Sequence, residues 1–425
     1  MKVVIVGAGF GGLRLARKLN NKPGFEIVLI DRFNYHQFQP LFYQVATGGL
    51  EPSSISFPLR KVFQKSKNVR IRLAELKEIV PDKNKIITDI GELDYDVLVL
   101  AMGADTNFFG NAAVSGNAFP MKTTVEALQL RNHLLLNFER GLTVKDEKEL
   151  QRLMNIVVVG GGPTGVELSG ALAEMKKYVL PKDFPELDFS KMHIYLLEGT
   201  EKTLGTMSEK SSEQSKRYLE KLGVNVLTGT MVNDYDGKNV ILKEGESIAS
   251  STVIWAAGVK GNIPGGVDKS MIFKGSRLIV DRHCRVSLYN NIYCIGDLAY
   301  METPKYPKGH PQVASVAIQQ AELLGENLRR IERKSTRFYE FEYHDKGSMA
   351  TVGRNLAVVD IPRPKLHFGG FFAWLVWMGL HLMLILGVKN RFFVFINWFY
   401  NYITYDQNLR LIFRGYNRDH KHETK

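Results

Sequence analysis

Two stretches of the sequence repeat one ordered pattern of strand, glycine triplet, helix, strand and acid. In the first copy, an apolar run at residues 3–6 precedes Gly7, Gly9 and Gly12, and a later apolar run ends at Asp31. An uninterrupted apolar run is typical of a parallel strand that helices cover on both faces. The three glycines allow, in order, a tight turn, the approach of a pyrophosphate and close packing of the next helix. The helix N-terminus favours a diphosphate, and the acid can accept both hydroxyls of a ribose, so this stretch predicts a dinucleotide site.

The second copy begins about 150 residues further along the chain. An apolar run at residues 155–159 precedes Gly160, Gly162 and Gly165, and the next apolar run leads into Glu198. A chance repetition of the whole ordered set is improbable. We therefore predict an α/β protein with two Rossmann-like domains that bind two dinucleotides, followed by a C-terminal hydrophobic and amphipathic helical region that anchors the chain to a membrane.

The length of the chain agrees with this organisation, because 425 residues are too many for one core. Apolar strands at 96–101 and 252–258 close the two repeats and return the chain to the first domain. We expect the first domain in two parts, 1–120 and 259–345, around a second domain at 121–258. Residues 346–425 form the expected anchoring region.

The composition separates the last part of the chain from the rest. The 56 basic and 44 acidic residues give a net charge of +12, and residues 351–425 carry ten of the basic and four of the acidic residues. Since aromatic and aliphatic residues surround these charges, they favour an anionic membrane surface over nucleic acid as the partner. The two cysteines have no metal-ligand spacing, so we expect no metal and ordinary thiols in a reducing cytoplasm. We also expect no secretory signal, because the first strand begins at the second residue.

Two segments of this basic region are candidates for the anchor. Residues 368–388 contain no Asp, Glu, Lys or Arg, and by length alone they qualify as a transmembrane helix. Residues 391–414 predict a second helix with one polar face, made of Asn397, Asn401, Thr404 and Asn408. Interfacial anchors are expected from three tryptophans: Trp374, Trp377 and Trp398. A dimerisation helix or a buried C-terminal cap is the alternative.

Two dinucleotides held face to face indicate hydride transfer between a nicotinamide and a flavin. The first site, with Asp31, should hold FAD permanently, and Asp297 should hydrogen-bond its ribityl or pyrophosphate region. The second should take NADH, because Glu198 would repel the 2′-phosphate of NADPH. Glu167, on the first turn of the second helix, is the candidate catalytic residue that polarises the carboxamide or tunes proton movement. The alternative is a helix-start acid that complements the helix dipole.

The number and positions of the cysteines narrow the choice of electron acceptor. A disulfide reductase needs a cysteine pair beside the flavin, and residues 33–46 contain none. A sulfide-oxidising quinone reductase needs reactive cysteines, and Cys284 and Cys294 lie outside every predicted flavin-facing segment. A ferredoxin or rubredoxin reductase stays open, as does a membrane-attached redox sensor with little turnover. The hydrophobic and basic anchoring region at residues 346–425, called the tail below, favours a quinone dissolved in the bilayer as the acceptor.

Five segments together resemble the type II NADH:quinone oxidoreductases over nearly the full length. They are VVIVGAGFGG (3–12), FQPLFYQVATG (38–48), VVVGGGPTGVELSG (157–170), YCIGDLA (293–299) and KNRFFVFINWFYNYITYDQNLRLI (389–412). The resemblance implies bound FAD and transfer of two electrons from NADH to ubiquinone or menaquinone without proton pumping. It also implies monotopic attachment to the cytoplasmic face of a bacterial inner membrane, with 368–388 packed on protein and lipid.

The same resemblance implies further site residues. Gly103 and Ala317 join the FAD site. The quinone residues it implies are Gln44, Ser315, Gln319 and Gln320. The family's A-Q-x-A-x-x-Q motif corresponds to residues 314–320, where Ser315 replaces the first glutamine. Which quinone is used, and whether the chain forms a homodimer, stay open.

Overall fold

The computed structural model describes residues 1–407 and 409–413. The chain divides into two compact units. Unit 1 comprises residues 1–37, 56–107 and 258–347, and unit 2 comprises residues 38–55, 108–257 and the chain from 348 on. The predicted anchoring region therefore belongs to the same unit as the second glycine motif.

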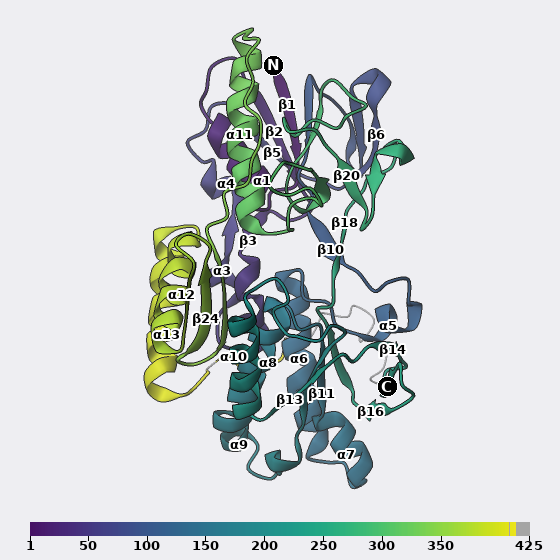
Figure 1. The fold of residues 1–425 in the computed structure, drawn as a ribbon, viewed down its shortest axis with the longest axis vertical. Helices are drawn as coiled ribbons and strands as arrows, with labels where there is room; N and C mark the ends of the chain where they lie inside the picture. Colours follow the sequence, from purple (N-terminus) through teal and green to yellow (C-terminus); the bar gives the residue numbers. More distant parts are fainter. Residues whose placement is uncertain (408, 414–425) are drawn as a thin grey trace, which may run out of the picture. The chain divides into compact units, whose positions relative to one another are not determined.

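Unit 1 is built on a five-stranded parallel sheet in the order β21-β9-β1-β2-β5 (Figure 1). Its strands are β1 (Lys2–Val6), β2 (Glu26–Asp31), β5 (Val69–Leu73), β9 (Val97–Leu100) and β21 (Ile292–Cys294). Helix α1 (Phe10–Leu19) connects β1 to β2, and α11 (Ala314–Glu332) packs beside it. Residues 3–6 of β1 are all buried, as their apolar run predicts for a central strand.

Unit 1 also contains the short helix α4 (Leu59–Val62) and small antiparallel or mixed sheets. The strands of these sheets are β3 (Tyr35–Gln37) with β4 (Ser56–Pro58); β6 (Leu76–Val80), β7 (Lys85–Thr88) and β8 (Gly91–Asp94); β10 (Ala104–Thr106) with β18 (Val259–Gly261); and β19 (Ile272–Phe273), β20 (Arg277–Ile279) and β22 (Ala299–Tyr300).

Unit 2 repeats the arrangement with a four-stranded parallel sheet in the order β13-β12-β11-β17. Its strands are β11 (Ile156–Val159), β12 (Ile194–Glu198), β13 (Val224–Thr228) and β17 (Thr252–Trp255). Helix α8 (Pro163–Tyr178) follows β11 as α1 follows β1. Around them lie α2 (Phe42–Ala46), α3 (Pro52–Ile55), α5 (Ala112–Asn117), α6 (Thr124–Gly141), α7 (Glu147–Met154), α9 (Leu180–Asp183), α10 (Glu209–Lys221), β14 (Val232–Tyr235), β15 (Asn239–Leu242) and β16 (Ser247–Ala249).

The C-terminal part of unit 2 is a three-stranded antiparallel sheet followed by two helices (Figure 1). The elements are β23 (Ser348–Gly353), β24 (Leu356–Ile361), β25 (Leu366–Gly369), α12 (Phe371–Leu384) and α13 (Val388–Thr404). Strand β23 packs closely on α8, because a Cβ at Gly170 would lie 1.5 Å from the Val352 carbonyl oxygen. Ala373 of α12 packs on Ala357 and Val359 of β24.

Both predicted tail helices have different bounds in the structure. The apolar run 368–388 is not one helix, because its start pairs with β24 as strand β25 and α12 ends at Leu384. The second helix begins at Val388 instead of 391 and ends at Thr404, where Tyr405 adopts a left-handed φ of 55°. Asn408 and Arg414, which the predicted helix includes, lie outside the described residues. Within the described part of the chain, no helix combines the length and apolarity needed to span a bilayer.

Candidate functional site

The first glycine motif leaves its backbone open at one position and crowded at the two others. Gly7 has a φ of +102°, and a Cβ there would lie 2.3 Å from the Ala101 carbonyl oxygen. A Cβ at Gly12 would lie 1.8 Å from the Gly7 carbonyl oxygen, whereas a Cβ at Gly9 would meet nothing within 4 Å. The open position at the start of α1 is the one through which a pyrophosphate approaches the helix N-terminus.

The acid that follows this motif is held by the backbone. Asp31 Oδ2 accepts a hydrogen bond from the Ala8 amide at 2.6 Å, and Oδ1 accepts one from the Phe33 amide at 2.7 Å. Burial raises the pKa of Asp31, while these two bonds and the charge of Arg32 lower it. Each carboxylate oxygen has a further lone pair, so a fixed Asp31 can still accept a ribose hydroxyl.

A second group of predicted FAD residues gathers around a turn in unit 1. Gly296 begins the short 3₁₀ turn that contains Asp297, and its φ is +75°. Its amide donates to Gln320 Oε1 at 2.7 Å, and a Cβ there would lie 3.2 Å from the Cβ of Ala317. Helix α11 therefore positions the turn through both residues. Gly103, with a φ of +66°, has open space at its Cβ position.

The other polar residues of α11 also bond within unit 1. The Ser315 hydroxyl lies 2.7 Å from the Tyr343 hydroxyl. Gln319 exchanges two hydrogen bonds with the backbone of His344, at 2.9 and 3.0 Å. The sequence pattern did not predict these partners. The quinone contacts of Ser315, Gln319 and Gln320 stay a prediction.

The second glycine motif reproduces the geometry of the first. Gly160 has a φ of +110°, and a Cβ there would lie 2.6 Å from the Ala256 backbone. A Cβ at Gly165 would lie 1.9 Å from the Gly160 carbonyl oxygen, and a Cβ at Gly162 would meet nothing within 4 Å. The repeated sequence pattern thus produces the same turn, opening and close packing twice.

The second acid is also held as the first is. Glu198 Oε2 accepts from the Gly161 amide at 2.5 Å, and Oε1 accepts from the Thr200 amide and hydroxyl, each at 2.8 Å. In both copies, one donor is the amide of the residue that follows the first glycine, and the other is the amide of the residue two positions past the acid. Glu198 therefore matches Asp31 as an oriented acceptor for a ribose.

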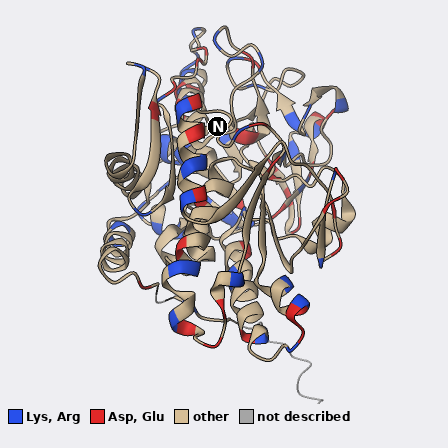
Figure 2. Cartoon of the chain, turned by 60° about the horizontal axis from the view of Figure 1, so that its bottom comes forward, with Lys and Arg blue, Asp and Glu red and all other residues tan. Residues whose placement is uncertain are grey.

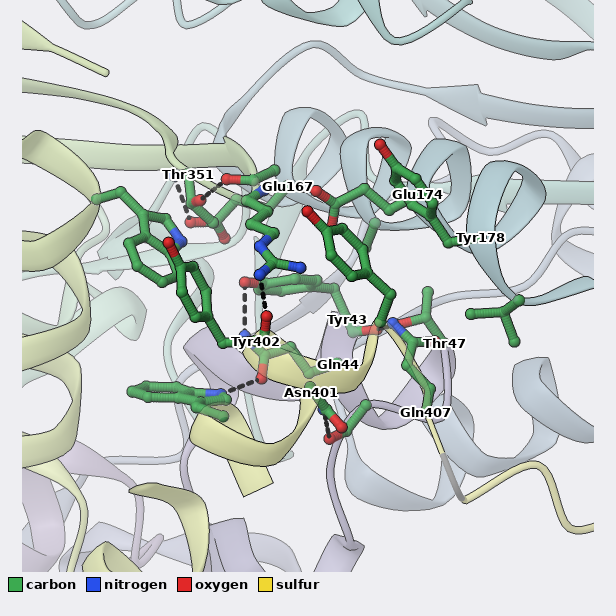
Figure 3. Close-up of a pocket in the computed structure, with 18 of the residues that line it drawn as sticks. Tyr43, Gln44, Thr47, Glu167, Glu174, Tyr178, Thr351, Asn401, Tyr402 and Gln407 are labelled. Atoms are coloured by element: carbon green, nitrogen blue, oxygen red, sulfur yellow. Dashed lines mark hydrogen bonds between the residues drawn. The ribbon is translucent and has the colours of Figure 1, made fainter. Parts of the chain in front are cut away.

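A pocket of about 140 Å³ lies within unit 2 (Figure 3). Side chains from α2, α8, β23, α12, α13 and the segment after α13 line it. On α8 the lining residues are Glu167, Ala171, Glu174 and Tyr178, which share one face of the helix. The pocket thus joins the predicted catalytic acid to the tail.

Glu167 is buried in the wall of this pocket, with 7% of its surface exposed. Its Oε1 accepts hydrogen bonds from the Thr351 amide at 3.3 Å and from Trp377 Nε1 at 3.2 Å. Burial raises the pKa of Glu167 to about 8, although both bonds lower it. A carboxyl group with this pKa is mostly protonated at neutral pH and can give up or regain a proton there.

Gln44, a predicted quinone residue, lines the same pocket. Its Oε1 accepts from Trp398 Nε1 at 2.7 Å, and its Nε2 donates to the Tyr43 hydroxyl at 2.8 Å. Burial raises the pKa of Tyr43 well above its usual value. These bonds fix an amide and a neutral phenol on the wall that α2 contributes.

Comparison with known proteins places the chain in a family. The family model for pyridine nucleotide-disulphide oxidoreductases matches residues 1–321, and the model for the NDH2 C-terminal domain matches residues 345–404. The type II NADH:quinone oxidoreductase Ndh of Mycobacterium tuberculosis is 35% identical over 422 residues, covering 93% of this chain and 87% of that protein. The chain belongs to the type II NADH:quinone oxidoreductases. The family and the α/β fold expected from the sequence are confirmed, and the anchoring role of the C-terminal region stays a prediction.

Other relatives agree with this membership. A type II NADH:quinone oxidoreductase of Staphylococcus aureus is 29% identical, with 83% of this chain and 87% of that protein covered. The structure of NDH2 from Plasmodium falciparum in complex with NADH has a TM-score of 0.87 and 22% identity, covering 97% of this chain and 99% of that one. At that identity the likeness is one of fold.

The three predicted anchor tryptophans of this family member, Trp374, Trp377 and Trp398, all line the pocket. Trp377 is only 1% exposed, so the prediction that it is an interfacial anchor is wrong, whereas this role stays a prediction for the partly exposed Trp374 and Trp398. The physical reason is that a buried indole needs a partner for its N–H group, which Trp377 and Trp398 find on Glu167 and Gln44. No spacing in the sequence indicated these partners.

The cysteines of this oxidoreductase are unsuited to thiol chemistry. Cys284 and Cys294 are both fully buried and free, and burial raises the pKa of each thiol well above its usual value. The reactive form of cysteine is the thiolate, which such an environment disfavours. Among the residues that the structure describes, no cluster of histidine, cysteine and acidic side chains could hold a metal.

Proposed function

We propose that this chain oxidises NADH and reduces a membrane quinone. The observation that carries this proposal is the pocket of unit 2, which joins a proton-holding carboxyl group, Glu167, to an aromatic wall and to the tail helices. Quinones are flat and apolar, and their reduction consumes protons, so such a pocket suits their chemistry.

The site at the first glycine motif, which we call the first cradle, fits FAD. An open backbone position at Gly9 and the oriented acid Asp31 match the pyrophosphate and the ribose of that cofactor. Asp297, on the turn that Ala317 and Gln320 hold, and Gly103 complete the residues that we assign to it. When bound, FAD supplies redox chemistry that takes a hydride from a nicotinamide and passes two electrons to a quinone.

The site at the second glycine motif, which we call the second cradle, supports NADH as the electron donor. Gly162 leaves room for the pyrophosphate, and Glu198 offers its carboxylate to the ribose hydroxyls. The 2′-phosphate of NADPH would meet that negative charge. This arrangement favours NADH over NADPH.

Glu167 has a role in the proton balance of the reaction. NADH, one proton and a quinone yield NAD⁺ and a quinol, so one proton must come from solvent for each turnover. Because Glu167 lines the pocket and its pKa is raised to about 8, it holds a proton there at neutral pH. We assign it to protonation of the quinone oxygen, directly or through one water.

The exposed faces of α12 and α13 support attachment to a membrane surface. Helix α12 contains no charged residue, so it is drawn entirely in tan in Figure 2. The exposed apolar side chains of the two helices are Phe371, Phe372, Leu375, Val376, Leu380, Met383, Leu384, Val388, Phe392, Phe393, Phe395, Ile396, Phe399, Tyr400 and Ile403. A monomeric soluble protein rarely exposes so large a contiguous set. Asn401, in contrast, turns toward the protein and donates to the Gly49 carbonyl.

We infer that this apolar face lies in the interfacial layer of a bilayer. Lys389 and Arg391, which are exposed on the first turn of α13, would meet anionic headgroups. Because the family resemblance implies monotopic attachment, we propose the cytoplasmic face of a bacterial inner membrane as the location.

Steady-state assays with the purified full-length protein test this proposal. Vesicles of phosphatidylglycerol and phosphatidylethanolamine that contain ubiquinone or menaquinone should support continuous NADH oxidation, and vesicles without quinone should not. A protein that NADH reduces once but that does not turn over with any quinone would instead be a redox sensor.

A further inference from the structure

Arg354 places a cation in the pocket wall of unit 2. It follows β23, and its backbone amide donates to Glu174. Its Nη2 donates to the Tyr402 carbonyl oxygen. Its guanidinium carbon lies 4.0 Å from the ring centroid of Tyr402 and 3.6 Å from that of Tyr405. These contacts fix the side chain against the end of α13.

Two of the donor groups of Arg354 remain unused. Nε and Nη1 are both buried, and neither has a hydrogen-bond acceptor among the residues that the structure describes. Leaving a buried charged donor without an acceptor is costly, because the group has lost its water. The same pocket contains the complementary case, since the buried Oε1 of Gln407 has no donor within the described chain. Glu167, Glu174, Tyr402 and Gln407 are all drawn around this space in Figure 3.

The surroundings indicate which ligand would supply the missing acceptor. Two acidic residues besides the protonated Glu167 line the pocket, namely Glu174 and Asp406, so a carboxylate or phosphate would meet like charge. The rings of Trp374, Trp377 and Tyr402 instead offer flat apolar surface. A flat uncharged ring that carries carbonyl oxygens satisfies both conditions.

We propose that Arg354 anchors the quinone headgroup by donating hydrogen bonds to one of its carbonyl oxygens, and that Gln407 accepts a hydrogen bond from the quinol hydroxyl. This inference rests on the proposed function of the pocket. When the quinone takes up two electrons, negative charge grows on its oxygens, and a fixed cation stabilises that charge before the protons arrive. One proton that derives from the hydride of NADH and one that comes from solvent through Glu167 then convert both oxygens to hydroxyl groups, one of which Gln407 can bind.

A purely structural role for Arg354 makes a different prediction. In that case the guanidinium only clamps the segment after α13 through its contacts with the two tyrosine rings. Tyr405→Leu removes one of those rings and keeps the cation. If clamping were the whole role, Tyr405→Leu would reduce quinone binding as much as Arg354→Gln does.

Quinone binding can be measured without turnover. Three of the four tryptophans line the pocket, so a short-chain ubiquinone analogue should quench the intrinsic fluorescence of the full-length, FAD-loaded protein. Hydrogen bonds to charged groups are among the stronger ones, so Arg354→Gln should weaken the Kd about tenfold or more. Reduction of the protein by NADH should not change. Arg363→Gln, an exposed arginine in the turn between β24 and β25 that does not line the pocket, is the control with the same change in charge and should bind as the wild type does.

The outcomes separate this inference from the proposed function. Wild-type affinity in Arg354→Gln, or an equal loss in Tyr405→Leu, overturns the role of Arg354 and leaves the quinone pocket in place. If Arg354→Gln does not fold, Arg354→Lys decides, because one ammonium cannot replace the guanidinium toward both Tyr402 and a quinone, and unchanged affinity would overturn the inference. A wild-type protein that NADH reduces but that binds no quinone overturns the proposed function itself.

Discussion

The Glu167 carboxylate accepts a hydrogen bond from the Trp377 indole at 3.2 Å, although 210 positions separate the two residues. Glu167 lies on α8, which the second glycine motif begins, and Trp377 lies on α12 in the tail. The same carboxylate oxygen accepts from the Thr351 amide of β23. The tail thus contributes to the burial that raises the pKa of Glu167, and so helps to set when this acid holds its proton.

Glu167→Gln should slow quinone reduction. Glutamine keeps an oxygen for the Trp377 and Thr351 donors but cannot release a proton, and general acid catalysis is worth roughly a hundredfold or more. The kcat with quinone should fall at least about tenfold, and the decline of wild-type activity as the pH rises through about 8 should disappear. Reduction of ferricyanide by NADH, which needs no proton donor in the pocket, is the control. Equal quinone kcat values in the variant and the wild type would exclude the assigned role.

The same substitution should change how stability depends on pH. Burial raises the pKa of Glu167 from 4.5 to about 8, so between these values the folded state binds more protons than the unfolded state. Wild-type stability is therefore lost as the pH rises through this window, and Glu167→Gln avoids that loss. The Tm of the variant minus that of the wild type should grow from about pH 5 to about pH 8 and then level off. A difference independent of pH would show that folding does not raise the pKa of Glu167.

Glu198→Gln should weaken the discrimination between the two nicotinamide cofactors. One close contact of like charge costs on the order of 4 kcal/mol at an effective dielectric of about 20, before screening and relaxation reduce it. We expect the wild type to show a kcat/KM for NADH at least about tenfold above that for NADPH. The variant should narrow this ratio mainly by improving NADPH. Equal wild-type values for both cofactors would contradict the assignment of Glu198.

Gln320→Leu should impair flavin retention. Gln320 is 1% exposed, and its oxygen is the acceptor for the Gly296 amide, which begins the turn that carries Asp297. Leucine leaves that amide unpaired and loosens the turn. The ratio of visible flavin absorbance to protein absorbance after dialysis should fall. Gln319→Leu is the matched control, because its partner is the His344 backbone, and it should keep its flavin. Full flavin content in both variants would exclude this role of the turn.

Polar substitutions on the exposed face of α13 should reduce membrane binding. Phe395 and Phe399 are 48% and 56% exposed, and neither lines the pocket. Burying one such side chain is worth roughly 1.5–3 kcal/mol, so the Phe395→Ser and Phe399→Ser double variant should bind anionic vesicles at least about tenfold more weakly. Flotation with vesicles measures the bound fraction. Ile90→Ser, at an exposed apolar position of unit 1, should bind as the wild type does. Unchanged flotation of the double variant would place the anchor elsewhere.

The two dinucleotide cradles could be predicted from the sequence because their contacts are local to each repeat. Gly12 packs on Gly7 and Gly165 on Gly160, five positions apart in both copies. Each acid is held by the residue after the first glycine and by a donor two positions past the acid. A fixed order of strand, turn, helix and strand brings these atoms together, so the spacing of a few residue types is enough.

The amino-acid sequence by itself therefore determined the family, the two nucleotide-binding folds and the apolar character of the tail. Only the tertiary structure decided where the tail helices end and what their tryptophans contact. No Asp, Glu, Lys or Arg interrupts the run 368–388, and pairing with β24 is what makes its first residues a strand. Trp377 has the same helical spacing whether it faces lipid or Glu167, and a pocket assembled from α2, α8, β23 and the tail fixes its partner. Periodicity specifies which residues share a face of a helix, but it does not specify what that face is packed against.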